Sequence, residues 1–278
     1  MEQRARICGK VFSNNHETRA RWHRVPTEHS QLGAAISNRQ SCYLRPKKAL
    51  ETVMLKTLYL SIGDFGLPTE CTYGLLKRSR CLCNFLEREV LKKVSFDADG
   101  FSRIVVGLKT NPSEGVVVNT SKVAVVDVRF DKIQYESKNG KDLMFYLVDR
   151  LQEGLYKCSR HVRIPLKELL TGIDEFITNG MKNEWTHKSR AFRKHGIVAN
   201  LNCKLTMEEF ELSLQIMRDQ ELVVDRVILR TDPDEIAFEQ RFKDIEIHED
   251  QLTVTAKRGG PLWHCSLSDL KLGSVKHK

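Results

Sequence analysis

Five residues in the first fifty positions carry side chains that bind zinc well. They are two cysteines and three histidines, at Cys8, His16, His23, His29 and Cys42. Zinc modules place their ligands in close pairs, so that one tight turn presents two of them together. Here neighbouring candidates lie six or more positions apart. We therefore expect no metal site, and a cellular nucleic-acid-binding regulator with a zinc-stabilised N-terminus remains an alternative.

The sequence lacks the common signatures of catalysis. It contains no phosphate-cradling G-x-x-x-x-G-K-[ST], no dinucleotide-binding G-x-G-x-x-G, no H-E-x-x-H and no G-x-S-x-G. The acidic stretch Asp97-Ala98-Asp99-Gly100 lacks the later acids of a calcium loop and is typical of a turn. We therefore expect a protein that is not an enzyme and holds no cofactor.

Clusters of basic residues indicate a different chemistry, the binding of phosphates. Near the N-terminus, six cations are interleaved with Phe12 and Trp22, which could stack on bases while the cations contact phosphates. Two shorter runs, at 45–48 and 77–80, are of the kind that anionic surfaces or nuclear import factors bind. The candidate polyanion-binding residues are Arg4, Arg6, Lys10, Arg19, Arg21, Arg24, Arg45, Lys47, Lys48, Lys77, Arg78 and Arg80. Ordinary solvated surface is the alternative reading of such short runs.

The charge is also unevenly distributed along the chain, whose net charge is +9. Residues 1–50 hold ten Lys and Arg against three Asp and Glu, whereas residues 201–256 hold six against fourteen. Such polarity can steer polyanions to one part of the molecule and can attract a second copy of the chain. We therefore expect a homo-oligomer.

Composition excludes several classes of protein. A hydrophobic content of 41% and a charged content of 29% are ordinary for a globular protein. The longest apolar runs fall far short of the roughly 20 residues that a membrane-spanning helix needs, and no apolar stretch follows the N-terminal charges. The eight cysteines are scattered, which is typical of reduced thiols. We expect an intracellular protein that is not secreted.

The periodicity of apolar residues predicts the elements that position these side chains, and the fold class is α+β. Residues 1–48 have few aliphatic side chains and are predicted to form a basic flexible arm. Residues 49–98 are predicted to be a helical region, with one helix at about 47–62 and a second at 72–94. Residues 99–278 are predicted to form an α+β globular domain.

Within residues 99–278, alternation and turn signals predict a mostly antiparallel sheet with flanking short helices and a C-terminal β-hairpin. Residues 181–195 are expected to be irregular, and Asp232 is expected to cap a short helix. The predicted strands are 101–108, 116–118, 122–130, 196–203, 210–216, 252–256 and 262–267. The predicted helices are 142–152, for which a strand is the alternative, 166–177 and 232–242.

The order of elements in the C-terminal third resembles the end of rhabdovirus matrix proteins. The resemblance rests on the strand 210–216, the acidic turn 219–221, the helix 232–242, and a final hairpin with Lys257 in its turn and Trp263 beyond it. Residues 130–156 fit the same pattern. The chain departs from the family in lacking P-P-x-Y and in having a longer, more helical region before residue 100.

This resemblance implies a viral structural protein that condenses ribonucleoprotein and links it to a membrane. The implied partners are a nucleocapsid or RNA, an anionic membrane surface bound peripherally, and further copies of the chain. The implied location is the virion and the host nucleus or cytoplasm, and a plant-infecting branch that matures at nuclear membranes would fit the basic charge.

A second resemblance is to the thirty-kilodalton superfamily of viral movement proteins. Residues 123–129, with the lone acid Asp127, resemble the core strand of that superfamily. It implies cell-to-cell movement and the binding of single-stranded RNA. We favour the matrix resemblance, because it also accounts for the terminal hairpin.

Overall fold

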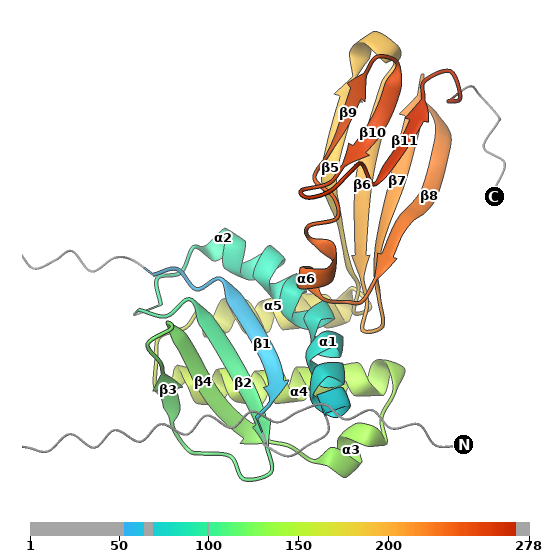
Figure 1. Cartoon of the computed structure of the whole chain (residues 1–278). Helices are drawn as coiled ribbons and strands as arrows, with labels where there is room; N and C mark the ends of the chain where they lie inside the picture. Colours follow the sequence, from blue (N-terminus) through green and yellow to red (C-terminus); the bar gives the residue numbers. More distant parts are fainter. Residues whose placement is uncertain (1–52, 64–68, 99, 271–278) are drawn as a thin grey trace, which may run out of the picture. The chain divides into compact units, whose positions relative to one another are not determined.

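The computed structural model describes residues 53–63, 69–98 and 100–270 (Figure 1). These residues build two hydrophobic cores, one from Leu55 to Phe176 and one from Ile197 to Leu270. We call residues 53–178 the α/β lobe and residues 183–270 the β lobe. The predicted arm at 1–48 lies outside the described residues.

The α/β lobe contains a four-stranded mixed sheet with the order β1-β2-β4-β3. Its strands are β1 (Thr57–Ile62), β2 (Arg103–Lys109), β3 (Val116–Val118) and β4 (Val123–Arg129). The strands β1, β2 and β4 run parallel, with Leu60 opposite Val106 and Val106 opposite Val126, whereas β3 is antiparallel to β4. Segments rich in valine favour β-strands, because β-branched side chains pack well on a pleated surface.

Helices cover one face of this sheet (Figure 1). The helices of this lobe are α1 (Thr69–Leu86), which continues through a π turn (Glu87–Leu91) into α2 (Lys92–Val94), then α3 (Lys132–Glu136), α4 (Gly140–Ser159) and α5 (Leu166–Thr178). The helices α1 and α4 pack against the strands, and α5 packs on α1 and α4. The alternate residues of each strand, such as Leu60, Val106 and Val126, point into the core beneath the helices. Gly154 lets α4 approach the sheet closely, since a Cβ there would lie 2.5 Å from Val106.

The β lobe consists of two antiparallel sheets with side chains of both in one core. The first sheet contains β5 (Asn183–Phe192), β6 (Ile197–Leu205), β7 (Phe210–Arg218) and β8 (Glu221–Thr231); after α6 (Glu235–Phe238), the second contains β9 (Asp244–His248), β10 (Gln251–Thr255) and β11 (Trp263–Ser266). Phe210 of the first sheet stacks on Phe238 of α6, with ring centroids 3.8 Å apart. Both rings belong to the core of this lobe, so α6 packs on the first sheet through Phe238.

The α+β class and the C-terminal hairpin are confirmed, since β10 and β11 pair antiparallel. The second predicted helix is also confirmed, but the first is wrong, because its residues include β1. Leu58, Leu60 and Ile62 are buried in strict alternation, and Leu58 and Ile62 happen to satisfy a helical spacing as well. Because β1 and α1 share a core with β2, the expected boundary at residue 99 falls inside the α/β lobe.

Three strands of the β lobe were not predicted. Residues 181–195, expected to be irregular, contain β5, and neither β8 nor β9 was foreseen. Most side chains of β5 are solvent-exposed, so the strand carries no apolar alternation. The predicted helix at 232–242 is shorter than expected, and Asp234 rather than Asp232 caps it by accepting a hydrogen bond from the Ile236 N–H.

Candidate functional site

The basic run at 77–80 lies in α1, and its three cations are engaged within the protein. Lys77 Nζ lies 2.5 Å from Asp232, and Arg78 donates to the Tyr135 hydroxyl at 3.1 Å. Arg80 is only 3% exposed. The expectation of polyanion binding is therefore wrong for Arg80, and at Lys77 and Arg78 a polyanion would compete with these contacts.

Arg80 is the centre of a buried polar network that joins the two lobes. Its Nε donates to both carboxylate oxygens of Glu235, at 3.0 and 2.8 Å. Its Nη1 donates to the Leu58 carbonyl at 2.8 Å, and its Nη2 donates to Glu87 at 3.0 Å. Asn84 also donates to Glu235, at 2.9 Å. One guanidinium thus ties together α1, β1 and α6, a role that its planar fork of donors suits.

The electrostatics of this network depend on the pairing of its charges. Burial opposes the charge of Arg80, but hydrogen bonds to Glu235 and the charge of Glu87 outweigh it and raise the pKa of Arg80. Burial raises the pKa of Glu87 above its ordinary value, although Arg80 partly offsets that rise. Each charge is therefore tolerable in the interior only while its partner is present.

Asn183, at the start of β5, makes a second polar connection between the lobes. Its amide donates to the Cys81 carbonyl at 2.9 Å and to the Asn84 side chain at 3.1 Å, and its oxygen accepts from Arg88 at 3.0 Å. The Arg88 guanidinium also lies over the Trp185 ring, 4.2 Å from its centroid. The two connections between the lobes meet at Asn84, which donates to Glu235 and accepts from Asn183.

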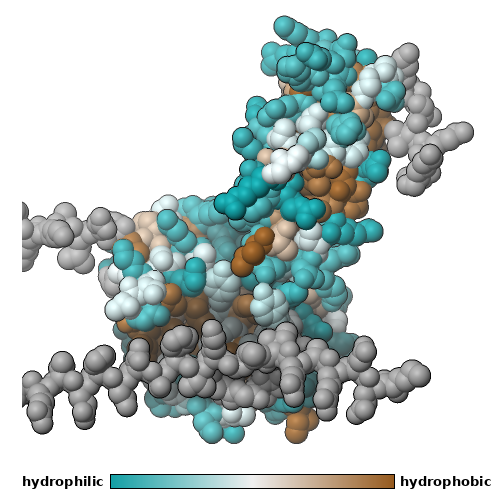
Figure 2. Space-filling model, in the orientation of Figure 1, coloured by the Kyte–Doolittle hydropathy of each residue, from teal (hydrophilic) through white to brown (hydrophobic). Residues whose placement is uncertain are grey.

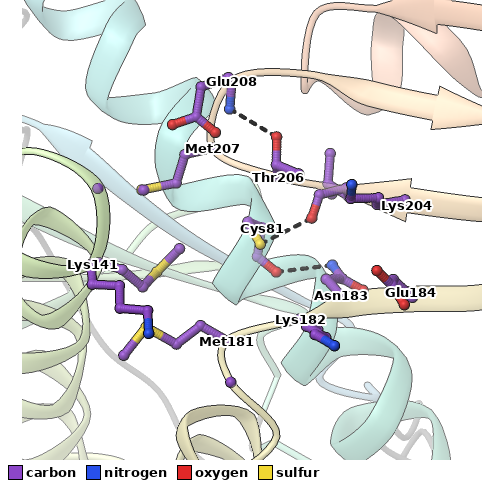
Figure 3. Close-up of a pocket in the computed structure, with 14 residues that line it drawn as sticks. Cys81, Lys141, Met181, Lys182, Asn183, Glu184, Lys204, Thr206, Met207 and Glu208 are labelled. Atoms are coloured by element: carbon purple, nitrogen blue, oxygen red, sulfur yellow. Dashed lines mark hydrogen bonds between the residues drawn. The ribbon is translucent and has the colours of Figure 1, made fainter.

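A pocket lies beside this joint, where α1, the start of α4, the start of β5 and the β6–β7 turn meet (Figure 3). Its volume is about 290 Å³. Its floor is buried or half-buried and mostly apolar, and comprises Cys81, Met144, Met181, Leu205 and Met207. Its mouth carries the exposed charged residues Lys141, Lys182, Glu184, Lys204 and Glu208.

The thiol in this floor is a neutral group. Cys81 Sγ donates to the Leu205 carbonyl at 3.1 Å, and burial raises its pKa to about 12. Because the thiolate is the form that attacks electrophiles and binds metals, this thiol is unsuited to either task near neutral pH. Burial likewise raises the pKa values of Cys83, Cys158 and Cys203 to about 12 and that of Cys265 to about 11.

Asp127, the residue of the movement-protein resemblance, lies buried near the end of β4. Its Oδ2 accepts hydrogen bonds from Lys109 Nζ at 2.9 Å and from the Ser113 hydroxyl at 2.6 Å. Burial opposes its ionisation, but these hydrogen bonds outweigh burial and lower the pKa of Asp127. The carboxylate therefore fastens the loop at 110–115 to the sheet.

The helix-free face of the α/β sheet carries a row of apolar side chains. Tyr59, Val105, Val125 and Val117 lie in register across all four strands, and Val117 is 63% exposed. Figure 2 shows hydrophobic atoms over the strands of this lobe. By strand alternation the same face bears the charged residues Arg103, Lys109, Asp127 and Arg129. This face combines apolar area with an excess of cations.

Nine of the twelve candidate polyanion-binding residues lie outside the described residues. They are Arg4, Arg6, Lys10, Arg19, Arg21, Arg24, Arg45, Lys47 and Lys48. The five candidate zinc ligands also lie outside the described residues. Within 53–63, 69–98 and 100–270, no three His, Cys, Asp or Glu side chains lie close enough together to hold a metal ion. No helix in those ranges is both long and apolar enough to span a membrane.

The described residues are nearly balanced in charge. They hold 32 Lys and Arg against 30 Asp and Glu, whereas residues 1–52 hold ten against four. The positive charge of the chain therefore lies mainly before β1.

The residues that line the pocket are far apart in the sequence. Met144, Met181 and Met207 come from α4, from the α5–β5 connection and from the β6–β7 turn. Only the tertiary fold brings them together, so no local pattern could have predicted their proximity.

No protein-family model, no curated protein and no solved structure matches the chain.

Proposed function

We propose that this chain is a non-enzymatic viral structural protein of matrix type, which condenses a ribonucleoprotein and ties it to an anionic membrane face. The observation that carries the proposal is the uneven distribution of charge along the chain. Residues 1–52 hold ten Lys and Arg against four Asp and Glu, while the described residues are nearly neutral. A cationic segment attached to a neutral folded body suits the binding of phosphates by counterion release.

The open face of the α/β sheet supports the membrane part of the proposal. Its apolar row ends at Val117 and is accompanied by Arg103 and Arg129, while Lys109 on the same face is paired with Asp127. Cations beside exposed apolar side chains suit a surface of anionic lipid, because lysine and arginine near such a surface each contribute roughly 1 kcal/mol. The contact would be peripheral.

The neutral thiols and the engaged Asp127 support a role without catalysis. The buried cysteines are held as thiols by raised pKa values, and the Asp127 carboxylate is bound by Lys109 and Ser113. Self-association of the polarised chain into a homo-oligomer completes the proposal, with the virion and the host nucleus or cytoplasm as its location. Since Asp127 has this internal role, no further observation favours the movement-protein alternative, and that alternative stays a prediction.

The proposal can be tested by reversing charge in two places. The variant R4E/R6E/K10E changes three cations in the N-terminal segment, and the control K92E/K167E/K194E makes the same change at exposed positions of the fold. Binding of the full chain to a single-stranded RNA and to vesicles containing phosphatidylserine is measured from 50 to 300 mM salt. We expect the first variant to weaken both interactions by more than about tenfold and the control to weaken them far less.

The salt dependence gives a second readout. Each lost phosphate contact lowers the slope of log affinity against log salt by about 0.7 for single strands, so three lost contacts change the slope by about 2. An equal loss of affinity for RNA and vesicles in the two variants would contradict the proposal. So would a chain that stays monomeric and ignores RNA and acidic vesicles at low salt.

A further inference from the structure

The first sheet of the β lobe has an outer face that is open in the described part of the chain. The second sheet packs on its other face, where side chains of both sheets share one core (Figure 1). On the open face, side chains lie in four rows, each of which crosses β5, β6, β7 and β8. Every side chain in these rows is exposed or half-buried. We call this surface the outer sheet face.

One end of the outer sheet face is apolar. Ala191, Val198, Met217 and Leu222 lie in register there, one on each strand. Val198 is 39% exposed and Leu222 is 52% exposed. Removing apolar area from water is favourable, so this row favours contact with another apolar surface.

The other end of the outer sheet face carries alternating charges. Glu184, Lys204, Glu211 and Arg230 lie in register, so negative and positive side chains follow one another across the sheet. Within the chain, Glu211 already pairs with Lys204 at 3.7 Å and with Arg230 at 2.7 Å. The row is therefore neutral as a whole, and it suits a surface with the same alternation better than a ligand of one charge.

The two rows between these ends are nearly free of charge. Their side chains are mostly hydroxyls and amides, and Asp225 is the one ionised group. One row holds Ser189, Asn200, Gln215 and Asp225, and the next holds Thr186, Asn202, Ser213 and Val227. A surface in water normally mixes charges of both signs, whereas the centre of a protein interface is depleted of them. The outer sheet face has the second pattern.

A twofold axis that runs along the strands, between β6 and β7, lays this face on a copy of itself. Each row then lies over the same row of the second copy, with the strand order reversed. Glu184 comes over Arg230 of the second copy, Lys204 over Glu211, and the apolar row over the apolar row. An axis across the strands would instead place the charged row on the apolar row.

We propose that a second copy of the chain packs on the outer sheet face, sheet to sheet, to form a twofold dimer. Twisted sheets pack face to face with their strands about 30° apart, an angle that a twofold axis along the mean strand direction produces. This inference deepens the proposed function and rests on it for the self-association alone. The binding of RNA or lipid could fail while the dimer still forms.

The size of the face indicates a weak dimer. Four strands span about 19 Å, and the seven residues of β6 from Val198 to Lys204 span about 24 Å, which gives roughly 450 Å² on each copy. A standard stable interface buries about 800 Å² on each partner. A hollow of about 520 Å³ over the two rows nearest the charged end would hold water between the copies, as wet interfaces do. The dimer therefore dissociates on dilution.

Sedimentation velocity of the full chain, without RNA or lipid, tests the surface. From about 1 to 200 μM, we expect the wild type to pass from monomer to dimer. Val198→Asp places an unpaired carboxylate in the apolar row and should weaken the dimer more than about tenfold. The control Val118→Asp makes the same change at a valine that is 45% exposed on β3, and it should leave the dimer unchanged. Equal melting temperatures of the two variants verify that both fold.

A mixture of two charge variants tests the orientation. In a dimer of Glu184→Lys, or of Arg230→Glu, like charges face each other at both symmetry-related contacts. In a mixed dimer the introduced lysine faces the introduced glutamate, and the native Arg230 faces the native Glu184. We therefore expect an equimolar mixture to dimerise at least about tenfold more tightly than either variant alone.

Three results would overturn the proposal. The first is a wild type that stays monomeric over the whole range, which would leave the outer sheet face to a different protein. The second is an equal effect of Val198→Asp and Val118→Asp, and the third is a mixture that dimerises no better than its components. Loss of RNA or vesicle binding in R4E/R6E/K10E bears on the proposed function alone, because sedimentation is measured without either ligand.

Discussion

Replacing Arg80 by methionine removes the cation at the centre of the joint between the lobes and keeps a side chain of similar length. Glu87 and Glu235 then lose the guanidinium that binds both of them at 3.0 Å or less. Removing one partner of a buried ion pair costs about 3–5 kcal/mol, since the remaining charge is left uncompensated. We therefore expect the free energy of unfolding to fall by about that amount.

Lys77→Met is the matched control for this substitution. Lys77 lies one turn earlier in α1 and pairs with Asp232, whose side chain is 63% exposed. An exposed pair contributes only about 0.2–1 kcal/mol, because water screens it. Urea unfolding followed by far-ultraviolet circular dichroism measures both variants. With a slope near 2–3 kcal/mol/M, the unfolding midpoint of Arg80→Met should drop by about 1–2 M and that of Lys77→Met by much less.

The pH dependence of the Arg80→Met effect follows from Glu87. Burial raises the pKa of Glu87, and removing Arg80 takes away the charge that partly offsets this rise. A carboxyl with a raised pKa in the folded state favours folding at low pH and loses that benefit as pH rises through its folded pKa. The difference in free energy of unfolding between the wild type and Arg80→Met should therefore be smaller near pH 5 than at pH 7.5. The reasoning would be refuted if Arg80→Met lost no more free energy of unfolding than Lys77→Met. It would also be refuted if the loss in Arg80→Met were the same at both pH values.

Two further predictions concern single sites. Hydrogen bonds from Arg190 lower the pKa of Asp244, so the pair stabilises the fold above the ordinary aspartate pKa and loses this contribution as pH falls. Asp244→Asn should therefore make the melting temperature fall less steeply between pH 6 and 2. A fall as steep as that of the wild type would contradict this. Gly154→Ala should lower stability by about 1–3 kcal/mol, because the added Cβ meets Val106 at 2.5 Å, whereas Gly74→Ala in α1, with nothing within 4 Å, should raise it by up to about 1 kcal/mol. Melting temperatures that shift in the same direction for both variants would contradict this contrast.

Elements whose apolar residues recur at a regular spacing could be predicted from the sequence. The prediction was wrong or missing where that spacing was weak or fitted both a helix and a strand. The helices at α4 and α5 and the strands β6 and β7 carry clear stripes or alternation, and all four were expected. β1 was read as a helix, because Leu58 and Ile62 satisfy both periods. β5 was missed because it is an edge strand of its sheet and exposes most of its polar side chains.

The role of Arg80 could have been found from the sequence. It lies in a helix that was predicted correctly, and Asn84 and Glu87 follow it at four and seven positions, on the same helical face. The basic run at 77–80 places Arg80 beside Arg78 in the sequence, although residues two positions apart in a helix point in different directions. Its other partner, Glu235, was beyond prediction, because only the packing of α6 brings it to α1.

The Arg80 network also constrains the order in which a newly made chain can complete its fold. Arg80 and Glu235 are separated by 155 positions. At a synthesis rate of about 5–20 residues per second, roughly 8–30 seconds pass between their appearances at the ribosome. During that interval the nascent α/β lobe can pair Arg80 with Glu87 and the Leu58 carbonyl alone. The contacts of Asn183 with α1 can form earlier, but the Arg80–Glu235 contact is one of the last parts of the joint to form, and a ribosome that stalls before residue 235 leaves that contact unmade.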